Sequence, residues 1–385
     1  MIVVWGSAAW DATRLGSQSI AQALAVDHPV LYVDPAASVA RLARDRQLGE
    51  IRAPRLRLIA PDLARLTPLG PPATSRLGPY FGVARTWLGP ALRRAVAALE
   101  GTVRAVLSGY VTYDPFGLCQ ERLRVFRASD DFAAGADLIG VNTTRLQRLE
   151  LALARKADLI VCVSPPLMQK WRALGFDPLL IPNGCDAELL ANAQHASRPP
   201  DVDLPSPIVG MSGQVSKRID LRLLEAVADR GHSLLLVGRL RPDLAPAAIA
   251  SLLERPNVQW VGFRPYEDLP SYLGAMDVGI VPYTNSAFNR ASFPLKTLEY
   301  LAAGLPVVST DLPAVRWLDT DLVRVVGDPE AFADAVEQAV QRSDDPGEIA
   351  RRMAFAAQHS WRERAAEYEA AFARLESGPR PRRQY

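Results

Sequence analysis

A pattern of strand, loop, helix and strand occurs twice in this chain and constrains its fold more than any other feature. The first copy places apolar strands at residues 2–5 and 29–34, and the second places them at residues 208–213 and 233–237. A helix between two buried strands is typical of a βαβ unit, which builds a parallel sheet. We therefore expect an α/β chain with two doubly wound, Rossmann-like domains.

Length and composition suggest where these domains begin and end. The 385 residues suit two domains, each with its own core. The best linker is the polar, proline-rich stretch at 187–207, so the domains are expected at 1–186 and 208–358. An Asp-x-Asp pair, Asp201 and Asp203, lies in that stretch, and we interpret it as solvated spacer and not as a metal site.

Charge and cysteine content argue against several classes of protein. A net charge of +2 gives no reason to expect nucleic acid or an anionic membrane as a partner. The cysteines are widely spaced and form neither a disulfide framework nor a metal motif, which fits a reducing cytoplasm. No basic segment precedes a long apolar run at the N-terminus, and no apolar run approaches the ~18 residues of a membrane span. We expect a cytoplasmic globular protein. The cysteines are Cys119, Cys162 and Cys185.

Lysine is rare among the basic residues. Of 44 lysines and arginines, the lysines are Lys156, Lys170, Lys217 and Lys296. With the abundant alanine and proline, this bias indicates a high-GC bacterial genome in which arginine replaces lysine wherever either will do. A lysine kept against that bias is the better candidate for a role that needs a compact ammonium group.

The stretch at residues 289–311 holds the strongest candidate ligand site. Its sequence predicts a helix with Ser292 as N-cap that ends at Gly304, before a buried strand. Free N–H groups at a helix N-terminus bind phosphate, and Lys296 lies in the first turn. Glu299, about one turn later, can accept hydrogen bonds from two sugar hydroxyls. Phosphate and diol together predict a nucleoside diphosphate.

A second candidate for phosphate binding follows the strand at 208–213. Gly213 ends that strand, and Lys217 and Arg218 come before the next helix. Backbone N–H groups and two cations at a strand-to-helix junction suit an anion. Both phosphate candidates lie in the second half of the chain, so that half is expected to bind the nucleotide.

Two further candidates lie in the first half. The loop at residues 6–11 follows the first strand at the carboxyl edge, where parallel sheets bind ligands; a plain tight turn is the alternative. Asp130 and Asp131 follow another buried strand. They can cap a helix N-terminus, or one of them can serve as a general base for a bound acceptor.

Residues 80–99 predict an amphipathic helix with aromatic and basic residues side by side. One interpretation is a face that contacts a membrane surface or a lipid-linked acceptor. The other is a packed helix with a solvated arginine side. The residues concerned are Tyr80, Phe81, Trp87, Arg85, Arg93 and Arg94.

Several stretches resemble the GT-B glycosyltransferases. They are FPLKTLEYLAAGLPVVSTDLPAVR (293–316), LIPNGCD (180–186), VGFRPYEDLPSYLGAMDVGIVPY (261–283) and the final helix at 359–376, which begins HSW. The resemblance covers most of the chain. It implies two Rossmann-like domains facing a cleft, with the final helix packing back on the first domain.

Three further motifs narrow the resemblance. WGSAAWD (5–11), DDF (130–132) and KRIDLRLLEAVA (217–228) are similar to bacterial teichuronic-acid-type glycosyltransferases and, more distantly, to the xanthan glucuronosyltransferase. The resemblance implies that the second domain holds a nucleotide sugar and the first domain the acceptor.

The resemblance also implies roles for individual residues. In the second domain, Gly213, Lys217 and Arg218 would face the diphosphate, Phe263 and Arg264 would lie beside the base, Phe293, Pro294, Leu295 and Lys296 would cap the phosphate, and Glu299 would bind the ribose. In the first domain, Gly6, Trp10 and Asp11 would contact the acceptor.

One departure from the family pattern bears on mechanism. Retaining relatives often carry two glutamates seven residues apart; Glu299 fits the second, but the first falls on Ala291. They also tend to have a histidine in the first domain, where this chain has Asp130 and Asp131. Asp131 as a general base, with direct displacement and inversion, is therefore an option. No metal is needed if Lys217, Arg218 and the helix N-terminus stabilise the leaving diphosphate.

The function implied is hexosyl transfer from a nucleoside diphosphate sugar, with uridine or thymidine as the nucleoside and no further cofactor. The acceptor hydroxyl would belong to a cell-surface glycan, a lipid-linked precursor or a natural product, and a lipid-linked one would bring the protein to the inner face of the membrane. Two alternatives stay open. One is a sugar-nucleotide epimerase on the same fold, and the other is an inactive nucleotide-sugar binder, which Ala291 supports.

Overall fold

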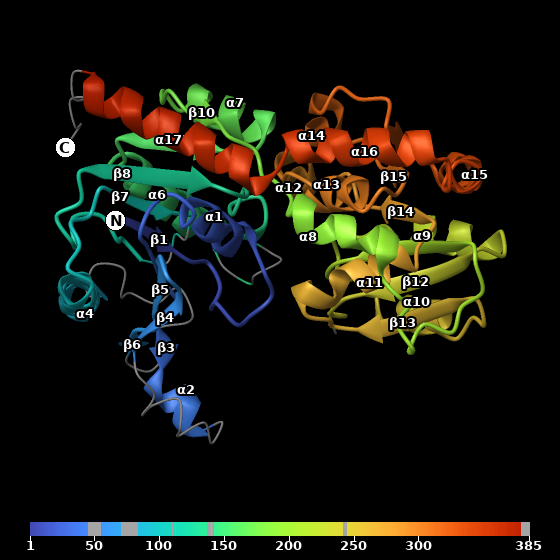
Figure 1. Cartoon of the computed structure of the whole chain (residues 1–385), viewed down its shortest axis with the longest axis horizontal. Helices are drawn as coiled ribbons and strands as arrows, with labels where there is room; N and C mark the ends of the chain where they lie inside the picture. The colour runs from blue at the N-terminus through green and yellow to red at the C-terminus, as the bar shows by residue number, and fades with distance from the viewer. Residues whose placement is uncertain are drawn as a thin grey trace. The chain divides into compact units, whose positions relative to one another are not determined.

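The computed structural model describes residues 1–44, 55–70, 84–109, 111, 113–136, 140, 142–241 and 245–378. The chain divides into two compact units (Figure 1). Unit 1 comprises Met1–Val163, Leu167–Pro182 and Arg364–Tyr385, and unit 2 comprises Ser164–Pro166 and Asn183–Glu363. None of the helices in the described part of the chain is long and apolar enough to cross a bilayer.

Unit 1 is built on an eight-stranded sheet in the order β10-β9-β8-β7-β1-β2-β5-β4. Its neighbours pair in parallel except β4 and β5. The chain leaves β1 toward β2 and later returns to β7 on its other side, so the strand order switches between β1 and β7. The strands are β1 (Ile2–Trp5), β2 (Val30–Val33), β4 (Leu56–Ala60), β5 (Leu63–Leu66), β7 (Ala105–Ser108), β8 (Leu123–Ala128), β9 (Leu159–Cys162) and β10 (Leu179–Leu180).

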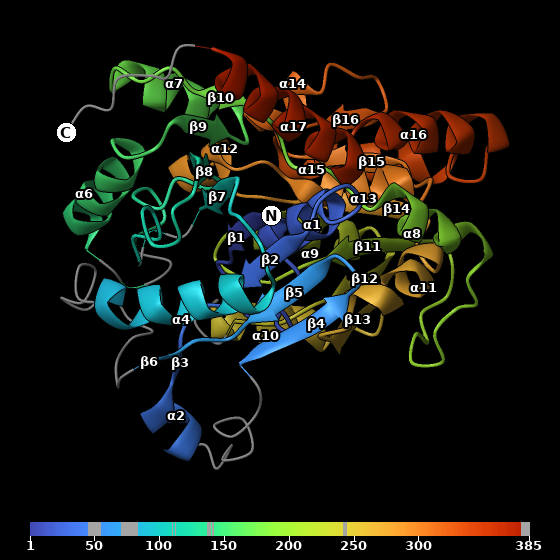
Figure 2. The same ribbon diagram turned by 60° about the vertical axis from the view of Figure 1, so that its left-hand side comes forward.

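Helices complete unit 1. They are α1 (Gly16–Leu24), α2 (Val39–Arg44), α4 (Ala84–Ala98), α6 (Thr143–Ala154), α7 (Pro165–Ala173) and α17 (Trp361–Ser377). A short ribbon of β3 (Ala37–Ser38) and β6 (Leu69–Gly70) extends with α2 away from the main sheet (Figure 2).

The last helix, α17, belongs to unit 1 from Arg364 onward. It buries Tyr368 and Phe372 almost completely. Arg104, just before β7, donates hydrogen bonds to the carboxylates of Glu369 (2.7 Å) and Glu376 (2.8 Å). Apolar burial and ion pairs therefore fix a segment from the end of the sequence beside strands from its beginning.

Unit 2 contains a six-stranded parallel sheet in the order β13-β12-β11-β14-β15-β16, which switches between β11 and β14. The strands are β11 (Ile208–Ser212), β12 (Ser233–Val237), β13 (Val258–Gly262), β14 (Val278–Val281), β15 (Val307–Ser309) and β16 (Val323–Val325). The helices are α8 (Ala187–Ala191), η1 (Asn192–His195), α9 (Leu221–Asp229), α10 (Pro246–Leu253), η2 (Tyr266–Asp268), α11 (Leu269–Gly274), α12 (Ala287–Ala291), α13 (Leu295–Ala302), α14 (Pro313–Trp317), α15 (Pro329–Val340) and α16 (Pro346–Gln358).

Glycine positions let two side chains pack closely on the sheet of unit 2. A Cβ at Gly279 on β14 would lie 2.4 Å from the ring of Tyr300 on α13. A Cβ at Gly210 on β11 would lie 2.0 Å from the sulfur of Met276. Real contacts of that length do not occur, so these glycines set how near α13 comes to the strands.

The segment at 187–207, which composition predicts as a linker, belongs to unit 2 in the structure. This segment forms α8 and η1, which pack against α11, α13 and α16 of unit 2. Leu190, Val202 and Leu204 are buried, so this segment makes apolar contacts although most of its residues are polar. The units separate instead between Pro182 and Asn183.

Candidate functional site

The N-terminus of α13 carries no side-chain cap. Ser292, the expected N-cap, instead lies at the C-terminus of α12, where its hydroxyl donates to the carbonyl of Phe288 (2.9 Å). The N-cap of α13 is Pro294, which has no side-chain oxygen. The N–H groups of the first turn therefore have no side-chain cap, which is the condition for binding an anion there.

Tyr300 joins α13 to the end of β11. Its hydroxyl accepts a hydrogen bond from the backbone N–H of Ser212 at 2.7 Å. Burial raises the pKa of this hydroxyl, so it stays neutral. Gly213 follows directly, and Gly279 provides the space for the ring. The contact thus brings the loop after β11 against the start of α13, at the switch in strand order where such sheets bind ligands.

Gly213 and Lys296 meet at this junction. A Cβ at Gly213 would lie 3.5 Å from the Cε of Lys296. Gly213 has φ +134°, and Gly238 after β12 has φ +146°. A Cβ at Gly238 would lie 1.8 Å from the carbonyl oxygen of Gly213, so the two loops can meet only as glycines.

Glu299 lies one turn into α13 and is buried (2% exposed). Its Oε2 accepts a hydrogen bond from the Nζ of Lys296 at 2.5 Å. Lys296 therefore balances the buried carboxylate and holds it at the start of the helix. The three residues Gly213, Lys296 and Glu299, predicted from two separate motifs, come together in one place.

Lys217 and Arg218 follow the same loop and differ in their surroundings. Lys217 is exposed. The Nε of Arg218 donates to the side-chain oxygen of Asn289 (2.8 Å), and its guanidinium lies over the rings of Tyr283 (5.0 Å) and Phe288 (4.9 Å). Arg218 thus connects this loop to α12, which precedes α13 in the chain.

The expected base-binding pair, Phe263 and Arg264, lies after β13. Phe263 is exposed, with the guanidinium of Arg239 4.3 Å from its ring centre. Arg264 instead forms an ion pair with Asp201 and donates from Nε to the hydroxyl of Tyr272. Asp201, interpreted as solvated spacer, is still 39% exposed but has Arg264 as a partner, which the sequence did not indicate. Nor did the sequence indicate Arg239.

The remaining residues of the expected cap lie in or before the first turn of α13. Phe293 is buried, with its ring 6.5 Å from that of Trp317 on α14. Leu295 is the first residue of the helix. Ala291, where a glutamate was considered, is buried, and its carbonyl accepts a hydrogen bond from the hydroxyl of Ser164.

In unit 1, the loop at residues 6–11 is held by a buried carboxylate. Asp34 (0% exposed) accepts from the backbone N–H of Trp10 (2.9 Å) and from the Nε of Arg65 (2.7 Å). The Nη1 of Arg65 also donates to Asp11 (2.5 Å). Asp34 follows β2 and Arg65 lies near the end of β5, both far in sequence from the loop at residues 6–11. The sequence therefore did not indicate that they hold this loop.

Gly6 and Trp10 pack around Tyr32. A Cβ at Gly6 would lie 2.1 Å from the Tyr32 hydroxyl, and the ring of Trp10 meets that of Tyr32 edge to face at 4.9 Å. Close packing against Tyr32 thus requires glycine at position 6. This agrees with the alternative interpretation of the loop as a plain tight turn. Trp10 and Asp11 are the members of this group that retain solvent exposure.

The acidic pair follows β8. Asp131 Oδ1 accepts from the Nζ of Lys170 on α7 (2.8 Å) and from the N–H of Ala134 (3.1 Å). Lys170 also donates to Glu150 on α6 (3.3 Å). Asp131 therefore makes the backbone contact expected if it caps a helix. It also has a lysine partner that the sequence did not reveal.

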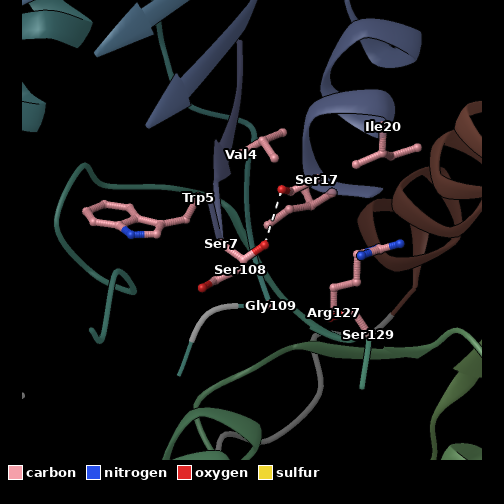
Figure 3. Close-up of a pocket in the computed structure, with 10 residues that line it drawn as sticks. Val4, Trp5, Ser7, Ser17, Ile20, Ser108, Gly109, Arg127 and Ser129 are labelled. Atoms are coloured by element: carbon pink, nitrogen blue, oxygen red, sulfur yellow. Dashed lines mark hydrogen bonds between the residues drawn. The ribbon is translucent and has the colours of Figure 1, made fainter. Parts of the chain in front are cut away.

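A small pocket, part of it open to solvent, lies where β1, β7 and β8 end and α1 begins (Figure 3). Its position is the switch in strand order of unit 1, beside the loop at 6–11. Hydroxyl groups dominate its polar lining, and those of Ser7 and Ser17 lie 3.5 Å apart. The polar lining residues are Ser7, Ser17, Ser108, Ser129 and Arg127.

The arginines of α4 are partly used for packing. Arg85 donates to Asp114 (2.9 Å) and to the carbonyl of Phe116 (2.6 Å), and Arg93 donates to the carbonyl of Leu118 (3.2 Å). Leu88, Leu92 and Ala95 are buried. These contacts match the packed-helix interpretation; Tyr80 and Phe81 lie outside the described residues.

Side chains that bind metal do not gather within the ranges that the structure describes. No group of three or more His, Cys, Asp or Glu residues with suitable spacing is found there.

Comparison with solved structures identifies the fold. Sucrose-phosphate synthase from Thermosynechococcus elongatus aligns with a TM-score of 0.69 at 18% identity, over 98% of this chain and 99% of that one. The catalytic domain of starch synthase IV from Arabidopsis thaliana, bound to ADP and acarbose, aligns with a TM-score of 0.65 at 14% identity, over 98% and 99%. The fold is GT-B. At these identities the likeness concerns fold alone.

Sequence comparison singles out one part of the GT-B fold. Residues 207–342, which contain Gly213 and α13, match the family glycosyl transferases group 1. TuaH of Bacillus subtilis (strain 168), to which a role as a teichuronic acid biosynthesis glycosyltransferase is ascribed, is 32% identical over 212 residues. That alignment covers 52% of this chain and 53% of TuaH, so the chain spans about half the length of this relative.

HepE of Anabaena adds a GT-B structure with a nucleotide. It was solved in complex with UDP and aligns with a TM-score of 0.64 at 16% identity, over 97% of this chain and 99% of that one.

Proposed function

We propose that this protein transfers a sugar from a nucleoside diphosphate sugar to an acceptor hydroxyl. The observation that carries the proposal is the uncapped start of α13 beside Gly213 and Lys296, inside the segment that matches glycosyl transferases group 1. A helix N-terminus with a lysine and a glycine loop suits a diphosphate. The GT-B fold and the teichuronic-type relative support the same activity.

The diphosphate would lie against the N–H groups of α13 and Lys296, with Lys217 and Arg218 adding charge. These groups would stabilise the negative charge that develops on the leaving diphosphate, the role that a metal ion has in other transferases. Phe263 and Arg239 form an exposed stack beside which the base would lie. We propose uridine or thymidine as the nucleoside, which the UDP complex of HepE favours.

The acceptor would bind in unit 1, beside the loop at residues 6–11, which carries Trp10 and Asp11 and contributes Ser7 to the pocket at the ends of β1, β7 and β8. Its hydroxyl lining suits a sugar or another polyol. Asp131 would take the proton from the acceptor hydroxyl while the new C–O bond forms at the anomeric carbon. The bond to the diphosphate breaks in the same step and the diphosphate leaves with the electron pair, so configuration inverts.

Calorimetric titration with UDP, dTDP and GDP tests the donor site. We expect UDP or dTDP to bind and Lys296→Met to weaken binding by about 10- to 100-fold, the cost of one hydrogen bond to a charged group. Arg316→Gln, which removes an exposed arginine of the same unit, is the control and should leave affinity unchanged. No binding of any of the three would overturn the proposal.

Turnover separates the enzyme from an inactive nucleotide-sugar binder. Release of the nucleoside diphosphate should depend on both the sugar nucleotide and an acceptor mixture, and the anomeric configuration of the product should be inverted. Binding without release under every acceptor condition would favour the inactive binder.

A lipid-linked acceptor would place the protein at the inner face of a membrane. Support comes from the exposed Arg93 and Arg94 on α4. Sedimentation with anionic vesicles at low and high salt tests the idea, and equal recovery in the supernatant with and without vesicles would contradict it.

A further inference from the structure

Asp131 belongs to a cluster of three charged side chains from three elements of unit 1. The Nζ of Lys170 on α7 lies 2.8 Å from Asp131 Oδ1 and 3.3 Å from Glu150 Oε2 on α6. The side chain of Glu150 is 3% exposed, that of Asp131 18% and that of Lys170 26%. One ammonium group is therefore shared by a buried and a partly exposed carboxylate.

The two oxygens of Asp131 differ in their surroundings. Oδ1 accepts from Lys170 and from the backbone N–H of Ala134 (3.1 Å). Oδ2 has no donor among the residues for which the structure gives contacts. Since Oδ1 is occupied, Oδ2 is the oxygen on which Asp131 can receive a proton.

Glu150 changes its charge near neutral pH. Burial raises its pKa to about 7, and the negative charge of Asp131 raises it as well, whereas Lys170 and the N–H of Phe132 lower it. Lys170 also faces the thiol of Cys162 on β9, whose pKa burial raises to about 12, so that thiol stays neutral. Lys170 further lies 5.7 Å from the ring centre of Trp171.

We propose that Lys170 and Glu150 are positioning residues for Asp131. Lys170 holds Oδ1 and leaves Oδ2 for the acceptor hydroxyl, while ionisation of Glu150 makes Asp131 a stronger base. When Glu150 is neutral, Asp131 alone balances the charge of Lys170. When Glu150 is ionised, two carboxylates share one ammonium group, so Lys170 stabilises the negative charge of Asp131 less. The proposal rests on the proposed function, in which Asp131 takes that proton.

The proton balance needs no further reactant. The acceptor hydroxyl gives its proton to Oδ2 as its oxygen bonds to the anomeric carbon, and the diphosphate leaves with the electrons of the broken bond. Asp131 then returns the proton to solvent. Glu150 exchanges its own proton with solvent as the pH changes and takes no part in the bond exchange.

The experiment is a pH profile of kcat at saturating donor and acceptor, from about pH 5.5 to about pH 8.5, for the wild type and Glu150→Gln. In the wild type kcat should rise about tenfold through neutral pH, as Glu150 ionises and competes with Asp131 for Lys170. Glu150→Gln should stay at the lower level throughout. A rise in Glu150→Gln equal to that of the wild type would overturn the proposal.

Lysine variants test the role of Lys170 in positioning Asp131. Lys170→Met should lose activity, and Lys170→Arg should restore part of it with the rise in kcat retained. Lys156→Met is the matched control, because Lys156 pairs with Asp114 in a different cluster (2.5 Å), and its pH profile should follow that of the wild type. A Lys170→Met profile like that of the wild type would contradict the positioning role.

Other measurements separate this proposal from the proposed function. No transfer by the wild type sinks the proposed function itself. Transfer that survives in Asp131→Asn removes the base and with it this inference. Where a variant is poorly folded, infrared spectra of the wild type decide: a carboxylic acid band should disappear between about pH 6 and about pH 8. Its absence at about pH 6 would overturn the proposal.

Discussion

Asp34 shows how one residue can fix a loop. It is fully buried at the end of β2 and accepts hydrogen bonds from Trp10, Arg65 and Thr67. Arg65 carries the only counter-charge among these donors. A buried carboxylate that loses its partner is strongly destabilising, whereas an exposed one is not.

Two substitutions at Arg65 and its exposed partner should therefore differ sharply. Arg65→Met leaves the charge of Asp34 buried and should lower the free energy of unfolding by about 3–5 kcal/mol. Asp11→Asn removes a carboxylate that is 73% exposed and should change it by less than about 1 kcal/mol. Urea denaturation of both variants measures the difference; similar small losses would show that Asp34 is not the buried anchor of the loop.

Glu150 should make stability depend on pH. Its pKa is about 7 in the folded chain against an ordinary value of 4.5, so between these values the folded state holds a proton that the unfolded state has lost. Stability of the wild type should therefore fall as the pH rises from about 4.5 through about 7, by about 3 kcal/mol.

The variant Glu150→Gln should lack this dependence. Relative to the wild type, it should gain about 3 kcal/mol between about pH 5 and about pH 8 in urea denaturation. Glu100→Gln, at an exposed glutamate of the same unit, is the control and should follow the wild type. Parallel curves for all three proteins would argue against the raised pKa of Glu150.

The rarity of lysine in this sequence helped to indicate which basic residues have specific partners. Lys296, Lys170 and Lys156 each pair with a carboxylate, and only Lys296 has its partner within reach along a helix. The partners of Lys170 and Lys156 lie 39 and 42 positions away, at Asp131 and Asp114. Sequence bias can therefore indicate the lysine, but only the folded sheet brings in the carboxylate.

Among the elements, α13 owes its place to a glycine on β14. Gly279→Ala would put a methyl group into the ring of Tyr300, and overpacking of this kind costs about 1–3 kcal/mol. We expect lower thermal stability of unit 2 and weaker nucleotide binding, since α13 must shift away from Gly213. Gly327→Ala, where nothing lies within 4 Å, is the control. Unchanged nucleotide affinity in Gly279→Ala would contradict this link.

The hydroxyl of Tyr300 can be tested separately from its ring. Tyr300→Phe keeps the packing but leaves the N–H of Ser212 without its partner, at a cost of about 1–3 kcal/mol. Calorimetric titration with UDP should show weaker binding than in the wild type. A variant that loses stability but not affinity would mean that the hydroxyl supports the fold and does not place the loop.

Element types were largely predictable, and element ends were not. The helix at α13 and the strand after it follow from their apolar pattern and Gly304. Ser292 was assigned to the wrong helix because a serine between two short helices can end one or begin the next, and the sequence does not say which. The composition of residues 187–207 is typical of a linker, but the few apolar residues of this stretch are buried in unit 2.

At the scale of the whole molecule, unit 1 is discontinuous. It includes α17 from Arg364 onward, whose Tyr368 and Phe372 are buried, with the guanidinium of Arg104 over the ring of Phe372. Unit 2, by contrast, is complete by Glu363. The two units should therefore respond differently to loss of the C-terminal helix.

A chain that ends at Glu363 should lose unit 1 and keep unit 2. Calorimetry should show one thermal transition in place of two, and UDP should still raise the remaining one, because a ligand at about 100 times its Kd adds about 2.7 kcal/mol. The full chain is the control. Retention of both transitions in the truncated chain would show that α17 is dispensable for unit 1.

The discontinuity of unit 1 also determines the order in which its parts are synthesised. The strands of unit 1 leave the ribosome before unit 2, whereas α17, which completes unit 1, follows unit 2 in the chain. At about 5–20 residues per second, those strands wait on the order of tens of seconds with apolar surface uncovered. Unit 2 can fold in that interval. Unit 1 is therefore the part of the nascent chain whose apolar surface stays uncovered longest during synthesis.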